Sequence, residues 1–185
     1  MILKTLYTLM ANWIVALVSL LAFLVIGRHL LAIDKDFRSS GDPSVVKLEL
    51  AYKKELFTAI LKTWIKSKGD GAIPAFRRQC WYDNLWAITY AALFSSVIAT
   101  VTIRFGQEPG TLVLLLFALP MLAALFDIFP ENSLYIVLLR DVRSDTEIDG
   151  LAAGPILVAS IAATIKFALL GAAFVGFVWV LLSNL

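Results

Sequence analysis

Residues 111–182 read TLVLLLFALPMLAALFDIFPENSLYIVLLRDVRSDTEIDGLAAGPILVASIAATIKFALLGAAFVGFVWVLL. Two apolar runs, 111–139 and 151–182, flank a polar turn at 140–150. Each run is long enough to cross the hydrocarbon core of a bilayer as a helix, which takes about 20 residues. The stretch therefore predicts an antiparallel pair of membrane helices.

Three charged residues interrupt this hairpin: Asp127 and Glu131 in the first run and Lys166 in the second. Positions 127 and 166 are equally distant from the centre of the turn, so antiparallel packing places them at the same depth. A charge in mid-membrane costs about 2.5–3.5 kcal/mol on insertion scales, so we expect the acids to pair with the base. Alanines adjoin each charge, and small residues favour close helix contacts in lipid.

A second interpretation of the same residues remains open. Pro130 removes a backbone donor and can end a helix. The first run would then end near Phe129, and Asp127, Glu131 and Asn132 would form a hydrated cap at the membrane surface.

The composition limits the chemistry that this chain can perform. Sixty per cent of its 185 residues are hydrophobic, against about 45–50 per cent in soluble domains. One cysteine, Cys80, and one histidine, His29, exclude a disulfide framework and a Cys- or His-based metal cluster. A net charge of +2 does not indicate nucleic acid. We therefore expect no catalytic residues, no metal, no cofactor and no nucleic-acid partner.

Two more apolar runs complete the predicted fold. The first lies within residues 1–27, and the other covers 85–103. The first is longer than a signal-peptide core, and no small-residue cleavage site follows it, so we expect it to be retained. The fold class is an all-α integral membrane protein with four transmembrane helices, at about 1–27, 85–103, 111–139 and 151–182, the last three forming one region, 85–185.

The basic segment 28–84 separates the first two spans and holds eleven of the sixteen Lys and Arg residues. Asp42 followed by Pro43 is typical of a helix start, and Gly69, Gly71 and Pro74 predict its end. An apolar stripe and flanking lysines predict an amphipathic helix on the cytoplasmic side. The stripe comprises Val46, Leu50, Phe57, Ile60, Leu61 and Trp64, and the lysines are Lys47, Lys54, Lys62 and Lys66.

Two surfaces could cover that stripe. A basic amphipathic helix suits an anionic membrane surface, but the same stripe could pack on the protein's own spans or on a partner subunit. The spacing of the apolar residues is the same in both cases, so it does not identify the surface that they meet. Just after this helix, arginines and aromatic residues predict anchors at the membrane–water interface: Arg77, Arg78, Trp81, Tyr82 and Trp86.

The orientation follows from the distribution of Lys and Arg. With four spans, one side receives 28–84 and the 140–150 turn, which together carry thirteen basic residues. The other side receives Lys4 and Arg104. The positive-inside rule then places both termini on the non-cytoplasmic side. We expect a bacterial inner (plasma) membrane location.

Three functional hypotheses follow from these features. The first is a non-catalytic accessory subunit of a larger membrane complex, for example a respiratory or photosynthetic one, that binds lipids and other subunits through apolar helix faces and the basic amphipathic helix. In it Asp127 and Lys166 would form a buried pair that fixes helix register. The second is a small ion- or proton-coupled transporter that uses Asp127, Glu131 and Lys166. A membrane enzyme acting on lipid ranks last.

Overall fold

The computed structural model describes residues 2–105, 109–142 and 145–182. The described residues form helices and no strand. Along the chain these are α1 (Ile2–Met10), α2 (Trp13–Phe37), α3 (Val45–Glu49), α4 (Lys54–Lys68), the 3-10 turn η1 (Gly69–Gly71), α5 (Ala72–Arg104), α6 (Thr111–Phe126), the π-helical segment η2 (Asp127–Asn132), α7 (Ser133–Leu138), α8 (Asp145–Asp149) and α9 (Ala153–Leu182).

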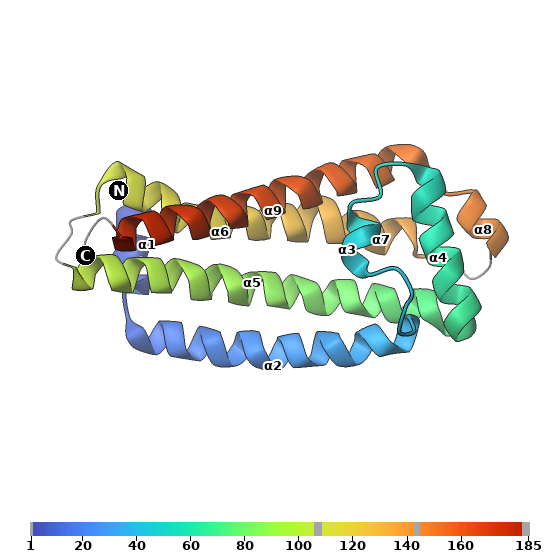
Figure 1. Ribbon diagram of the computed structural model, residues 1–185, viewed down its shortest axis with the longest axis horizontal. Coiled ribbons are helices and arrows are strands. Elements are labelled where there is room, and N and C mark those ends of the chain that lie inside the picture. Colours follow the sequence, from blue (N-terminus) through green and yellow to red (C-terminus); the bar gives the residue numbers. More distant parts are fainter. Residues whose placement is uncertain (1, 106–108, 143–144, 183–185) are drawn as a thin grey trace.

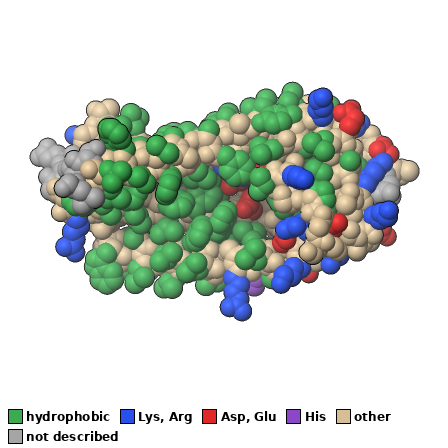
Figure 2. All heavy atoms as spheres, viewed as in Figure 1, with side chains coloured by type: hydrophobic (Ala, Val, Ile, Leu, Met, Phe, Trp, Pro, Cys, Tyr) green, Lys and Arg blue, Asp and Glu red, His purple; other side chains and the backbone are tan. Residues whose placement is uncertain are grey.

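Four stretches are long and apolar enough to cross a membrane. They contain α2, α5, the continuous α6–η2–α7 rod and α9. The all-helical class with four such helices, predicted from hydropathy, is confirmed. Hydrophobic side chains cover much of the long helices on the face shown in Figure 2, and charged side chains gather at the end that carries α4 and α8.

The long helices run side by side along the long axis of the molecule (Figure 1). Helix α5 packs against α2 on one side and against α6 on the other, and α6 packs against α9. Helix α4 crosses one end of this bundle, and α3 lies beside it over the flank of the bundle (Figure 1). The segment between α2 and α5 thus covers one half of the bundle. The other half is not covered by this segment, and its outer side chains are apolar.

Two predicted boundaries are wrong for local reasons. The first apolar run breaks at Asn12, whose side chain caps α2 by accepting a hydrogen bond from the Ile14 amide at 2.9 Å. The second long helix begins at Ala72, not Leu85. The predicted end of the preceding helix is confirmed, because α4 ends at Lys68 and Gly69–Gly71 form η1. Pro74 lies in the first turn of α5, where its missing N–H has no helical partner to lose.

The predicted amphipathic helix is divided into α3 and α4, with residues 50–53 between them. Its expected N-cap was Asp42, but that carboxylate accepts from the Ser39 amide at 2.7 Å. Ser44 instead caps α3, because its hydroxyl accepts a hydrogen bond from the Lys47 amide. A short first helix lets the chain turn inward before α4 begins.

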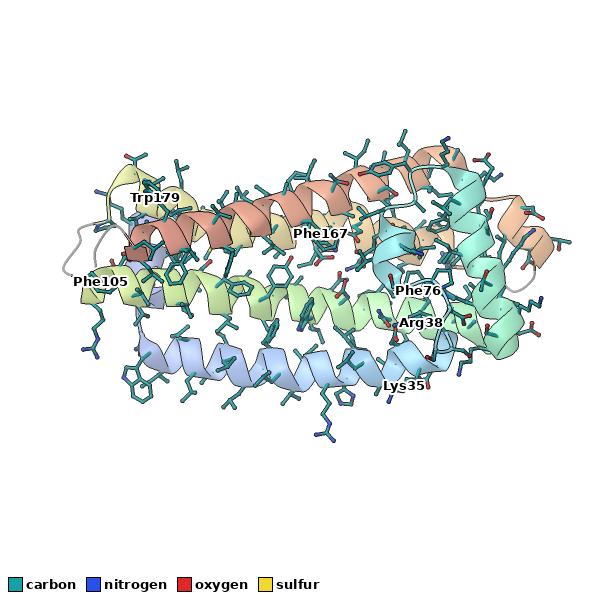
Figure 3. The ribbon with its side chains drawn as sticks, in the orientation of Figure 1. Lys35, Arg38, Phe76, Phe105, Phe167 and Trp179 are labelled. Carbon is teal, nitrogen blue, oxygen red and sulfur yellow. The ribbon has the colours of Figure 1, made fainter. Side chains whose placement is uncertain are left out.

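The apolar face of α4 packs on the protein itself. Phe57, Leu61 and Trp64 are fully buried and Ile60 nearly so, whereas Val46 and Leu50 of the same predicted stripe are exposed. The Trp64 ring lies 4.8 Å from that of Phe37 and 5.2 Å from that of Phe76, between centroids. Figure 3 labels Phe76, which α5 contributes to this core. Four of the six stripe residues thus hold α4 on the bundle.

Replacement of Trp64 by Ala should lower the free energy of unfolding by about 3–5 kcal/mol, the usual loss for a large buried aromatic residue. The change also leaves the Pro43 carbonyl without the indole N–H that donates to it at 2.9 Å. Unfolding in a mild detergent would measure the loss. Trp81→Ala is the control, because Trp81 is 61% exposed. Equal effects of the two changes would contradict packing of α4 on the bundle.

Candidate functional site

Lys166 lies near the middle of α9, beside Phe167 (labelled in Figure 3), and is 5% exposed. Its Nζ is 3.2 Å from Asp127 Oδ1 and 2.9 and 3.1 Å from the two carboxylate oxygens of Glu131. A third acid, Glu49 at the end of α3, approaches the same Nζ at 3.5 Å. We call these four residues the Lys166 cluster.

The two acids expected beside Lys166 come from η2, a single wide helical turn. The rod continues through Pro130, and Asp127, Glu131 and Asn132 are at most 2% exposed. The alternative of a hydrated cap after a helix end at Phe129 therefore does not hold. The Ser133 hydroxyl donates to the Ile128 carbonyl at 2.8 Å. Such π-helical turns are rare and occur often at functional sites.

Asp127 receives three hydrogen-bond donors from three helices or turns. The Tyr90 hydroxyl donates to Oδ2 at 3.2 Å, and the Asn132 amide and Lys166 ammonium each donate to Oδ1 at 3.2 Å. An ionised carboxylate is an acceptor on both oxygens, so this arrangement suits the charged form. Asp127 and Lys166 thus form a fully hydrogen-bonded ion pair.

Glu49 and Glu131 both approach the Lys166 ammonium, at 3.5 and 2.9 Å, so their carboxyl groups lie in one buried site. Burial and the repulsion between like charges there favour a proton on one of the two carboxyls. Burial raises the pKa of Glu49 above its ordinary value, and the attraction of Lys166 opposes this only in part. The protonated form of Glu49 is therefore favoured at pH values where an exposed glutamate is already ionised.

The charge balance of the cluster supports the same conclusion. Three ionised carboxylates around one ammonium would carry a net charge of −2. Removing charges from water is costly, and like charges in one buried site disfavour joint ionisation. At least one shared proton lowers that negative charge.

A polar chain leads from Asp127 toward the start of α5. The Asn132 amide nitrogen lies 3.2 Å from Asp83 Oδ2, 3.0 Å from Asn84 Oδ1 and 3.2 Å from Asp127 Oδ1. Its two hydrogens can serve two of these three acceptors at a time. Asp83 is half-buried, so the chain connects the cluster to a carboxylate that solvent reaches.

Among the buried polar atoms without a hydrogen-bond partner in the described part of the chain are two hydroxyls. These are the buried hydroxyl oxygens of Tyr135 and Ser160. Tyr135 is one turn beyond Glu131, and Ser160 precedes Lys166 on α9. Buried polar groups of this kind commonly bind water.

The other residues singled out from the sequence lie elsewhere. Arg77 donates to the Arg140 carbonyl at 2.8 Å, and Arg78 pairs with Asp36. Lys54 and Lys62 contact Asp149 of α8 through its carbonyl and its carboxylate, both at 2.7 Å. Lys47, Lys66 and Trp81 are exposed. Tyr82 faces His29 at 5.8 Å and Trp86 stacks on Phe23 at 5.0 Å, between ring centroids.

The sequence brought Asp127, Glu131 and Lys166 together but missed Glu49, Tyr90 and Asp83. Glu49 precedes Lys53 by four residues, a spacing typical of an ordinary surface ion pair on a helix. Nothing local distinguishes it from such a residue. Tyr90 resembled the other hydroxyl residues of the second span. Among the described residues, no group of three His, Cys, Asp or Glu side chains suits a metal ion.

Comparisons of the chain with protein-family models, with characterised proteins and with solved structures give no significant match. The candidate site therefore rests on its own geometry and charge.

The raised pKa of Glu49 predicts a pH-dependent stability. Between the ordinary pKa and the raised one, the folded chain holds a proton that the unfolded chain has lost. Stability should therefore fall as pH rises through this window, by at most about 1.4 kcal/mol per pH unit for one proton. Glu49→Gln should reduce the change of the unfolding free energy with pH. Unfolding in detergent at several pH values would measure this change.

The matched control is Glu55→Gln, because Glu55 is exposed on α4. It should keep the slope of the unaltered protein. Equal slopes for Glu49→Gln and the unaltered protein would show that Glu49 does not hold the proton.

Proposed function

We propose that this chain is a small multi-pass membrane protein that conducts protons or couples proton movement to transport. The proposal includes insertion of the four long apolar helices into a bilayer, which their length and composition favour. It also includes the absence of a catalytic activity, since the Lys166 cluster has the features of a proton-binding site and no nucleophile adjoins a general base within it.

The proposal rests on one observation, the approach of three buried acids, Glu49, Asp127 and Glu131, to the single ammonium of Lys166. A pair that only fixed helix register would need one acid and one base. Two further buried acids raise the desolvation penalty without being needed for register. Ionisable residues at membrane depth commonly mark proton relays. The presence of Glu49 as a third buried acid therefore favours transport over the accessory role.

A proton route from one side agrees with this function. The Asn132 amide joins the half-buried Asp83 to Asp127, and Asp127 shares Lys166 with Glu131. The Asn132 amide nitrogen only donates and does not accept a proton, so the acceptors along this route are the carboxylates of Asp83, Asp127 and Glu131. We place the Asp83 end of this route on the cytoplasmic side of a bacterial inner membrane, with both termini on the other side, because the basic residues gather at this end.

An accessory subunit remains the second candidate, for a separate reason. Helix α2 is little buried in the described structure and packs mainly on α5, and large apolar side chains face outward along it, including Ile14, Leu17 and Leu21. Another subunit could cover this face. The Lys166 cluster would then hold α3, η2 and α9 in register.

Proton flux into reconstituted vesicles tests the first proposal. With a pH gradient and a pH-sensitive dye inside, the unaltered protein should dissipate the gradient. Glu131→Gln and Lys166→Met should reduce the flux to that of protein-free vesicles, because each removes a member of the relay. Glu55→Gln should leave it unchanged. A folded Glu131→Gln variant with full flux would remove the cluster from the transport mechanism.

Purification from the native membrane in a mild detergent tests the second candidate. Co-migration with a large complex at fixed stoichiometry on a native gel would support an accessory role, and mass spectrometry would identify the partners. Charged substitution at the outward face, Leu17→Glu, should release the chain from that complex, whereas the conservative Leu17→Met should not. Migration of the chain alone would count against this role.

A further inference from the structure

A cleft of about 530 Å³ lies between α2, the start of α3 and one face of α5, outside the Lys166 cluster. Its apolar walls include Phe23, Leu24 and Trp86 at one end and Leu30 and Leu31 further along α2. Arg28 lies between these two groups, and Arg38 contributes positive charge at the far end. The α2 residues from Phe23 to Arg38 cover about 22 Å of helix, at about 1.5 Å per residue. This length and polarity suit an extended amphiphile with a charged head.

The charge of the polar end favours an anionic head. Arg28 and Arg38 carry two positive charges, and Asp34 carries one negative charge that pairs with Arg38 Nε at 2.5 Å. The cleft therefore has a net charge of +1. Figure 3 shows Arg38 on the α5 side of α2 and Lys35 on the opposite side, away from the cleft.

Two polar atoms in the wall lack a hydrogen-bond partner in the described structure. Trp86 contributes the donor Nε1 and Gln79 the acceptor Oε1, both shielded from water. The indole nitrogen lies close to Gly27, where an added Cβ would come within 3.3 Å of it. Buried polar groups are nearly always paired. Both atoms are shielded in the empty cleft, so a ligand reaches them only when these side chains move.

We propose that this cleft binds one anionic glycerophospholipid with a hydroxylated head, of the phosphatidylglycerol class. The phosphate lies at Arg38, one acyl chain runs from there along Leu31 toward Phe23, and Arg28 adds positive charge beside the chain. A head-group hydroxyl donates to Gln79 Oε1. Basic pockets between helices on the cytoplasmic side of membranes bind anionic lipid heads in this manner. The inference rests on the proposed membrane insertion and not on proton transport.

The experiment compares two lipids with identical acyl chains, phosphatidylglycerol and phosphatidylcholine, added to the full chain in a mild detergent. Native mass spectrometry should show one retained phosphatidylglycerol per chain. Its apparent dissociation constant should be at least tenfold lower than that of phosphatidylcholine. The double variant Arg28→Gln/Arg38→Gln should lose this preference, because it removes both positive charges.

Three further variants separate binding from folding. Lys35→Gln removes a positive charge from the same helix outside the cleft and should keep the preference. Asp34→Asn removes the negative charge beside Arg38 and should strengthen phosphatidylglycerol binding, an effect opposite to that of misfolding. Leu24→Trp fills the apolar end and should weaken both lipids.

Equal binding of the two lipids, or a preference that survives Arg28→Gln/Arg38→Gln, would overturn the inference. Soluble glycerophosphoglycerol that binds as well as the lipid would identify an anion site without a lipid chain, which also overturns it. Proton flux is measured separately, so a protein that binds the lipid but conducts no protons would refute transport alone. A protein with flux and no lipid preference would refute the cleft alone.

Discussion

The buried ammonium of Lys166 is the constraint on which the arrangement of this molecule depends. A lone charge at this depth is unfavourable by several kcal/mol, so the surrounding chain must supply partners. It does so from separate segments, since Asp127 and Glu131 lie in η2 and Glu49 ends α3. The need to bring Glu49 to α9 accounts for the inward turn of the chain between α3 and α4. The aromatic core around Trp64 then fixes α4 over the end of the bundle.

The π-helical turn at η2 makes this convergence possible. It carries Asp127, Glu131 and Asn132 inward together, and it accommodates Pro130, which has no N–H for an ordinary helical hydrogen bond. Asn132 links this turn to α5 through Asp83, and Tyr90 closes the site from the same helix. The result is a site where the Asp127–Lys166 ion pair is hydrogen-bonded on both carboxylate oxygens and a further buried acid, Glu49, has a pKa raised by burial.

Helix α2 has a different relation to the bundle. It is attached mainly through α5, and the cleft beside it combines apolar walls with two arginines. The aromatic pairs His29–Tyr82 and Phe23–Trp86 join α2 to α5 near this cleft. A lipid bound there would extend the contact between α2 and the rest of the protein. The ring of Trp86, which lines this cleft, lies 5.7 Å from that of Tyr90, which donates to Asp127, so the cleft and the Lys166 cluster adjoin along one face of α5.

The sequence by itself determined the helical class, the four long apolar helices and the meeting of Asp127, Glu131 and Lys166. The length of each apolar run matches the thickness of a bilayer. In an antiparallel helix pair, residues equally far from the turn lie at the same depth. Hydropathy does not detect single caps and turns. It therefore did not predict the break at Asn12, the start of α5 before Pro74 or the division into α3 and α4. The packing of Trp64, the approach of Glu49 and the cleft beside α2 were decided only by tertiary structure. Each joins residues far apart in the chain, and an apolar stripe or a surface acid does not specify what it will contact.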